Sequence, residues 1–428
     1  MIYLTNEIGG ETMSHLELQV VKNHSRTNNI LSTIILLSLI SLLVITDTDM
    51  NSVLSFNLVN KRIELFSIVL SLYILIIIFF TKRIKVDSIF ILLSLRIPFF
   101  LVHPLIYSEF NESFFANYLI VIIAPIVYQM VIMINTDSNI LVKRIVKYSI
   151  IIIMIQLISV YIVNIGKSIP AYMFKSNLKI PLGGSNYIAA ILLVLGIMSL
   201  KAFDKKSYAL LSFVGIFLTL SNSGIITSIL VLFIYLLKNS SKVRFISILK
   251  YVTGIVLLLG ISLIIANELR EYPYINSIFS RYTRLTNAVF NLGNNVNTSN
   301  IDISNGRLDI FSNILFMIKE KPILGWGLGI IENNSKVHNW LLQGLFNGGI
   351  IELSIYIFPL LVAIKKLWRN RSLEYSYFCL LALFASLTQG LVEPNYFTPA
   401  IELIIWLFIG ITLKDRRIKN KEERNTER

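Results

Sequence analysis

The sequence predicts an all-α polytopic membrane protein with about twelve transmembrane helices and a large outer loop between the ninth and the tenth. The first observation is composition: 55% of the 428 residues are hydrophobic, and the mean hydropathy is +0.69. These values exceed those of ordinary soluble domains. The second is a succession of apolar runs separated by short polar loops, and the third is the concentration of Lys and Arg in alternate loops.

Twelve apolar runs approach the roughly 20 residues that a helix needs to cross a hydrocarbon core about 30 Å thick. They are predicted at Ile30 to Ile45, Ile63 to Phe80, Ser88 to Tyr107, Asn117 to Ile134, Tyr148 to Ile165, Asn186 to Leu200, Tyr208 to Leu220, Gly224 to Leu237, Tyr251 to Ala266, Ile350 to Ile364, Tyr375 to Leu391 and Ala400 to Leu413. No small-residue cleavage site follows the first run, which favours a retained helix over a cleaved signal peptide. Because the number of runs is even, both termini are expected on the same side.

A polar, flexible sequence separates the seventh and eighth runs. SNSG at Ser221 to Gly224 interrupts the apolar stretch from Tyr208 to Leu237. Small polar residues with a glycine are typical of a break between elements. The sequence therefore predicts two short helices that meet near the outer face, and the charges of the flanking loops require this interpretation.

The net charge of +14 would suggest a nucleic-acid partner for a soluble protein. When the amino terminus is placed inside, however, most of the 39 Lys and Arg residues fall in inward loops, as the positive-inside rule requires. The excess of Lys and Arg therefore indicates how the chain is oriented in the membrane, and nucleic acid is not expected as a partner.

This orientation divides the chain into five segments. They are a cytoplasmic tail at residues 1–29, transmembrane helices 1 to 9 at 30–266, a large periplasmic or extracellular loop at 267–349, helices 10 to 12 at 350–413 and a basic cytoplasmic tail at 414–428. The large loop gathers an arginine, a histidine and several glycines between two apolar spans. It is the segment in which we expect the chemistry.

Two parts of the large loop have a predictable structure. Leu308 to Lys319 has apolar residues at helical spacing, and Pro322 ends that pattern. PILGWGLG, from Pro322 to Gly329, lacks the GK[ST] sequence and the preceding strand of a phosphate-binding loop. We predict a tight turn that lets two backbone segments approach, with Trp326 at the membrane interface.

His338 precedes an amphipathic stretch and is a candidate general base, since a neutral imidazole accepts a proton from a hydroxyl near physiological pH. The alternative is an interfacial histidine that caps a helix, and spacing alone favours it. No second histidine lies at metal-ligand spacing. Cys379 is the only cysteine, so no internal disulfide and no cysteine metal cluster can form. Neither a metal nor a cofactor is predicted.

Four arginines of the large loop are candidates for binding phosphate: Arg307, Arg270, Arg281 and Arg284. Planar guanidinium groups make bidentate contacts with phosphate oxygens. Alternatively, these side chains extend to lipid headgroups or pair with nearby carboxylates. Their positions favour neither interpretation.

Other ionisable residues lie within or beside the predicted spans. Arg96 and His103 fall in the third span, where charged side chains are costly and often functional. Arg96 could contact substrate, extend to headgroups or pair within the bundle. Glu393 follows the eleventh span and could orient His338, bind sugar hydroxyls or be an ordinary loop carboxylate.

The order of these elements resembles the O-antigen ligase and polymerase superfamily of bacterial membrane glycosyltransferases, which use undecaprenyl-diphosphate-linked glycans. The matching sequences are GSN at Gly184 to Asn186, GR at Gly306 and Arg307, KPILGWGLG from Lys321 and HNWLLQGLFNGGI from His338. The resemblance covers the second half of the chain. It implies a GT-C-like membrane fold with the large outer loop between helices 9 and 10.

One position departs from the family pattern. The family commonly has a serine and an arginine at the break between the two short helices, where this chain has Ser221 and Asn222. The resemblance therefore implies that a diphosphate contact is missing there. Arg281, Arg284 or Lys179 could replace it.

The resemblance also implies a chemistry: metal-independent, inverting glycosyl transfer in which a sugar hydroxyl displaces a lipid diphosphate. His338 would be the general base and Arg307 would neutralise the leaving diphosphate. The residues expected to bind substrate are Arg270, Arg281, Arg284, Lys179, Asn186, Asn339 and Glu393.

The predicted function is polymerisation of O-antigen or capsular repeat units at the outer face of the bacterial cytoplasmic (inner) membrane. The first alternative is the ligase that transfers finished glycan to lipid A core. A flippase for lipid-linked sugars is a different class, but such transporters are typically built from repeated halves, and no repeat is visible. The expected partners are the undecaprenyl-diphosphate-linked glycan, membrane lipid, a chain-length regulator and a flippase.

Overall fold

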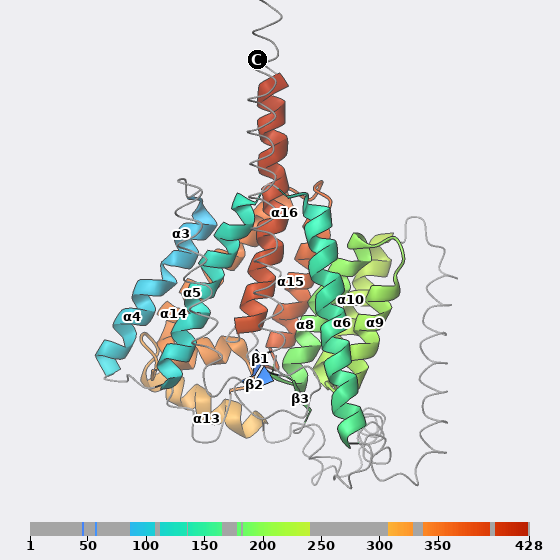
Figure 1. The fold of residues 1–428 in the computed structure, drawn as a ribbon. Helices are drawn as coiled ribbons and strands as arrows, with labels where there is room; N and C mark the ends of the chain where they lie inside the picture. Colours follow the sequence, from blue (N-terminus) through green and yellow to red (C-terminus); the bar gives the residue numbers. More distant parts are fainter. Residues whose placement is uncertain are drawn as a thin grey trace, which may run out of the picture.

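The computed structural model describes residues 45–46, 56–57, 86–107, 112–134, 136–164, 178–180, 183–239, 307–327, 337–393 and 399–426 (Figure 1). Over this part the chain is predominantly helical, as predicted. The helices are α3 (Ser88–Ser94), α4 (Arg96–Tyr107), α5 (Glu112–Met133), α6 (Ser138–Asn164), α8 (Ser185–Ala202), α9 (Ser207–Leu218), α10 (Asn222–Asn239), α13 (Arg307–Glu320), α14 (Trp340–Arg369), α15 (Ser376–Gly390) and α16 (Pro399–Thr426). Two short pairs of strands accompany them: β1 (Ile45–Thr46) with β2 (Phe56–Asn57), which are parallel, and β3 (Lys179–Ile180) with β4 (Gly183–Gly184), which are antiparallel.

Helices occupy nine of the predicted spans. The predicted spans at Ile30, Ile63 and Tyr251 lie outside the described residues. Within the described part, α6, α8 and α14 are the three helices long and apolar enough to cross a membrane, and several shorter helices are also apolar. This is the pattern of a membrane protein, and the total of twelve spans stays a prediction.

The predicted break between the seventh and eighth spans is confirmed. Helix α9 ends at Leu218 and α10 begins at Asn222. Leu220, between them, has a positive φ of 57°, a conformation that ends a helix. Within the third predicted span, α3 ends at Ser94 and α4 begins at Arg96, and Leu95 between them keeps helical dihedral angles.

Helix α8 lies at the centre of the bundle. Nearly every residue from Ile188 to Leu200 is buried, and α6, α9 and α15 pack around it (Figure 1). The Ser212 hydroxyl of α9 donates to the Leu192 carbonyl of α8 at 2.9 Å, so this small polar side chain is satisfied by backbone. Large apolar side chains such as Ile162 and Leu210 are exposed on the outer helices, as expected where lipid is the solvent.

Polar contacts at one end of the bundle join loops that the sequence assigned to the inside. The contacts are Lys201 with Glu374 at 3.0 Å, Lys366 with Asp87 at 3.2 Å, Tyr375 with Asn139 at 2.6 Å, and Lys414 with the Thr136 carbonyl. Helix α13 lies across the opposite end, away from the projecting carboxyl-terminal part of α16 (Figure 1). The grouping of these loops agrees with the predicted alternation, while the side that faces the cytoplasm stays a prediction.

The predicted tight turn before Gly329 packs against a break in α14. The backbone N–H of Trp326 donates to the Phe346 carbonyl at 2.8 Å, and that of Ile350 donates to the Pro322 carbonyl at 2.9 Å. Between Phe346, which accepts, and Ile350, which donates, Gly348 and Gly349 have non-helical dihedral angles. The turn therefore satisfies the backbone groups that the break in α14 leaves unpaired.

Gly349 is required by this close approach. Its φ is +64°, and a Cβ built there would lie 2.2 Å from the Ile323 carbonyl oxygen. An L-residue would suffer both the left-handed backbone and the collision. The break lies at the predicted boundary between the large loop and the tenth span.

Arg96 pairs within the bundle, which decides between the alternatives left open for it. Its side chain is fully buried, lies 3.3 Å from both carboxylate oxygens of Glu402, and has its guanidinium carbon 4.2 Å from the Tyr356 ring centroid. It therefore links α4 to α14 and α16. The side chain of His103 lies outside the described ones.

Candidate active site

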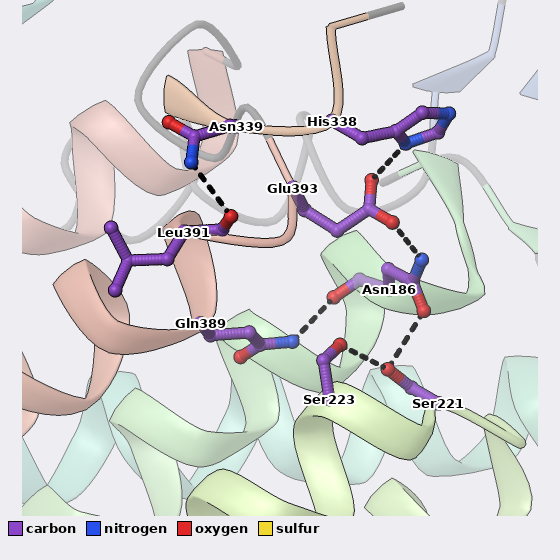
Figure 2. Close-up of polar contacts among 8 residues, drawn as sticks. All are labelled: Asn186, Ser221, Ser223, His338, Asn339, Gln389, Leu391 and Glu393. Carbon is purple, nitrogen blue, oxygen red and sulfur yellow. Dashed lines mark hydrogen bonds and ion pairs between the residues drawn. The ribbon is translucent and has the colours of Figure 1, made fainter. Parts of the chain in front are cut away.

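His338 and Glu393 meet at the end of the bundle that contains the starts of α8, α10 and α14 (Figure 2). The distance between His338 Nδ1 and Glu393 Oε2 is 3.3 Å. The Glu393 side chain is only 4% exposed, whereas that of His338 is 30% exposed. One edge of the imidazole thus contacts a buried carboxylate, and Figure 2 shows its other nitrogen pointing away from Glu393.

The carboxylate determines which imidazole nitrogen carries the proton. An ionised carboxylate only accepts hydrogen bonds, so His338 Nδ1–H is the donor. In the neutral ring, Nε2 is then the acceptor. This is the tautomer that a general base needs, because its unprotonated nitrogen is the one turned away from the carboxylate.

Asn339 fixes the backbone beside His338. Its Oδ1 accepts hydrogen bonds from the N–H groups of Leu341 at 2.9 Å and Leu342 at 3.1 Å, which makes it the N-cap of α14. Its Nδ2 donates to the Leu391 carbonyl at 2.9 Å, at the end of α15. One side chain therefore joins the two segments that carry His338 and Glu393.

Asn186, in the first turn of α8, binds the other oxygen of Glu393. Its Nδ2 donates to Glu393 Oε1, and its Oδ1 accepts from the Ser221 hydroxyl at 2.7 Å. Its main-chain carbonyl accepts from Gln389 Nε2 at 3.1 Å. The Asn186 side chain thus connects the Glu393 carboxylate to the segment between α9 and α10, and its main chain is bound by the end of α15 (Figure 2).

Comparison with known proteins identifies the relevant part of the chain. Residues 207–357 match the family model described as O-antigen ligase. This match supports the O-antigen ligase and polymerase superfamily. No curated protein matches the chain. The resemblance stated from the sequence is thereby confirmed, and the chain is a membrane protein with a domain from an enzyme family of membrane glycan transfer.

The superfamily match covers only part of the site. It includes Ser221 and His338, whereas Asn186 and Glu393 lie outside the matched residues. Folding brings these two residues from either side of the matched segment to the histidine within it. The site is therefore a product of the whole bundle.

His338 has a strained backbone. Among the described residues, the non-glycine positions with positive φ are Leu220, at 57°, and His338, at 49°. Such conformations cost about 1–3 kcal/mol and persist where surrounding contacts impose them. Leu220 immediately precedes Ser221, and His338 is the imidazole-bearing residue itself, so one strained residue adjoins the polar cluster and the other belongs to it.

Helix α13 packs against the residue that precedes His338. Val337 is fully buried and packs with Ile314, Ile318 and Phe346 in a small apolar cluster between α13 and α14. Because Val337 immediately precedes His338, this apolar cluster fixes the backbone next to the imidazole-bearing residue. The predicted helix at Leu308 to Lys319 is confirmed.

The structure describes some of the other predicted site residues and not others. Arg307 is the first residue of α13, but its side chain lies outside the described ones. Lys179 is exposed in β3 and pairs with Gly184, two residues before Asn186. Arg270, Arg281 and Arg284 lie outside the described residues. Their expected contacts with substrate stay predictions.

Sequence reasoning missed three members of the cluster: Ser221 as a side-chain partner, Ser223 and Gln389. Ser221 and Ser223 belong to the SNSG break, which was interpreted as a chain interruption and as the position of a missing diphosphate contact. Gln389 is a polar residue inside a predicted apolar span, and that was the available signal. In the part of the chain that the structure describes, no three His, Cys, Asp or Glu side chains gather as metal ligands.

Proposed function

We propose that the protein polymerises undecaprenyl-diphosphate-linked oligosaccharide repeat units into O-antigen or capsular polysaccharide at the outer face of the cytoplasmic membrane. The superfamily domain supplies the reaction class. The observation that carries the proposal is the hydrogen bond between His338 Nδ1 and the buried Glu393 carboxylate. A base held by a second group is the arrangement that hydroxyl activation requires.

In the proposed reaction, the acceptor sugar hydroxyl lies against His338 Nε2. Its oxygen attacks the anomeric carbon of the donor while its proton passes to Nε2. The bond from the anomeric carbon to the phosphate oxygen breaks, its electron pair stays on the lipid diphosphate, and the configuration inverts. General-base help of this kind contributes about 10²- to 10⁴-fold in rate.

Glu393 stabilises the imidazolium that forms. A negative charge beside Nδ1–H favours the protonated ring as the reaction proceeds. Arg307 is proposed to neutralise the negative charge that develops on the leaving diphosphate, with Arg270, Arg281, Arg284 and Lys179 as further candidates for the same charge. Guanidinium groups suit this role because they bind phosphate oxygens in pairs.

The second candidate function is transfer of finished glycan to lipid A core, because the matching family model is described as O-antigen ligase. The same base and the same leaving group would serve both reactions. Only the acceptor differs: a sugar of a second lipid-linked chain for the polymerase and a sugar of the lipid A core for the ligase.

The test is a reconstitution of the purified protein with synthetic undecaprenyl-diphosphate repeat units and no added metal, with products separated on a gel. We expect a ladder of chain lengths that is absent with His338→Ala. Transfer to added lipid A core without a ladder would favour the ligase, and lipid movement across a vesicle bilayer without either product would contradict an enzyme. Lys201→Ala, which removes an ion pair at the opposite end of the bundle, is the matched control.

A further inference from the structure

The carboxylate beside His338 is itself held by a chain of hydrogen bonds that begins on α10. We propose that Asn186 and Ser221 are positioning residues, which orient Glu393 so that its second oxygen faces the imidazole. This inference rests on the proposed function, in which His338 is the base. It replaces the sequence-based expectation that Asn186 binds substrate.

The orientation of the Asn186 amide is determined by its two partners. Ser221 Oγ–H donates to Asn186 Oδ1 at 2.7 Å, which places the carbonyl end of the amide toward α10. The amino end must then face the other way, and there it donates to Glu393 Oε1. A flipped amide would set its oxygen against a carboxylate oxygen, with no donor between them, so the observed orientation is the stable one.

Ser221 is fixed in turn by the start of α10. Its side chain is buried, and its Oγ accepts from the Gly224 N–H at 3.2 Å. The Ser223 hydroxyl lies 3.1 Å from the same oxygen. Because Ser221 has one hydroxyl proton and gives it to Asn186, Ser223 is the donor in that contact.

These contacts form a chain with one direction. Ser223 donates to Ser221, Ser221 donates to Asn186, and Asn186 donates to Glu393 (Figure 2). Hydrogen bonds aligned head to tail polarise one another, and each is electrostatically stronger in the protein interior than in water. The chain ends on a carboxylate whose residue is 3% exposed, and Asn186 therefore stabilises the charge that the imidazolium needs beside it.

The backbone reinforces the same orientation. Gln389 Nε2 donates to the Asn186 main-chain carbonyl at 3.1 Å, which ties the start of α8 to the end of α15. Glu393 follows that end by three residues, after the helix cap at Leu391. Side-chain and main-chain contacts of one residue, Asn186, thus fix both the carboxylate and the segment that carries it.

A direct substrate contact is the competing role for Asn186. Both ends of its amide already bind protein groups, so a sugar or diphosphate would have to displace one of them. The two roles differ kinetically. A substrate contact raises KM or acts independently of Glu393, whereas a positioning residue acts only through Glu393.

The experiment is a double-mutant cycle of Asn186→Leu and Glu393→Gln, assayed for initial rate of chain extension in purified protein. We expect Asn186→Leu to lower kcat by about 10-fold or more with little change in KM, because a carboxylate without this donor no longer holds the imidazole in place. The double variant should be no slower than Glu393→Gln alone, because residues that act as a unit are non-additive. Losses that multiply, or a rise in KM with kcat unchanged, would overturn the inference.

Two further variants keep the test decisive. Asn370→Leu makes the same change at a buried asparagine at the opposite end of the bundle, and it should leave kcat unchanged. If Asn186→Leu fails to insert, Ser221→Ala removes the donor one step earlier and should show the same non-additivity. Activity that survives His338→Ala would refute the proposed function itself, whereas additive losses with an inactive His338→Ala would refute the positioning role alone.

Discussion

His338 and Glu393 are separated by 55 positions in the chain, and their side chains meet at 3.3 Å. The histidine precedes α14 and the glutamate follows α15, so two antiparallel helices and their connection lie between them. The pair combines an accessible imidazole with a buried carboxylate. That asymmetry lets the ring exchange protons with a substrate while its orientation is held from the protein side.

The first prediction concerns the carboxylate. Glu393→Gln should lower kcat by at least about 10-fold, because the neutral amide cannot stabilise an imidazolium and no longer fixes the tautomer. The measurement is chain extension by purified protein over a range of pH. An unchanged rate would show that His338 acts without this partner, and Lys201→Ala again serves as the control.

The second prediction concerns the buried pair of Arg96 and Glu402. Arg96→Met should destabilise the detergent-solubilised protein by about 3–5 kcal/mol, because it leaves a buried carboxylate without its cation. Arg96→Met with Glu402→Gln should recover a large part of the loss, since the charge is then removed as well. The thermal midpoint of each variant is the measurement, and a double variant less stable than Arg96→Met would contradict the pairing.

The third prediction concerns Gly349. Gly349→Ala should prevent the turn at Pro322 from docking on α14, since the new Cβ collides with the Ile323 carbonyl and the backbone is left-handed. We expect low yield of folded protein and no chain extension. Gly184→Ala is the control for stability, because a Cβ there meets no atom within 4 Å.

The fourth prediction concerns topology. In a Cys379→Ser background, Lys179→Cys should react with a membrane-impermeant thiol reagent added from outside, and Lys205→Cys should react only after the membrane is opened. Both lysines are exposed, and they lie near opposite ends of α8. The opposite labelling pattern would invert the orientation and move the site to the cytoplasmic face.

The fifth prediction concerns pH and Asp87 at the inward end. Partial burial raises the pKa of this carboxyl, but hydrogen bonds from the Phe90 N–H and Tyr128 and the charge of Lys366 outweigh it, so the pKa lies below its usual value. A lowered pKa in the folded state contributes stability above the unfolded value, near 3.8, and that contribution is lost as pH falls through the folded value. Asp87→Asn keeps the helix cap and should lower the thermal midpoint at neutral pH, with the difference from the parent disappearing in acid. A difference that persists in acid would show that charge is not the cause.

The sequence by itself determined the class of fold, the helix at Leu308 to Lys319, the break at Ser221 and the family. These features depend on local composition and spacing: apolar length specifies a span, small polar residues specify a break, and a contiguous motif can be read without a structure. His338 and Glu393 were each found in this way. Their contact was one of several alternatives.

Only the tertiary structure decided which residues share a site. The site combines residues from several helices and loops: Asn186, Ser221, Gln389 and Glu393. In the sequence, each of them also has an ordinary structural explanation. Arg96 is the same case, since its position in a span did not reveal the partner on α16. Long-range pairing depends on how the helices pack and on which buried polar groups must form hydrogen bonds with one another. The pattern of residues along the sequence contains neither kind of information.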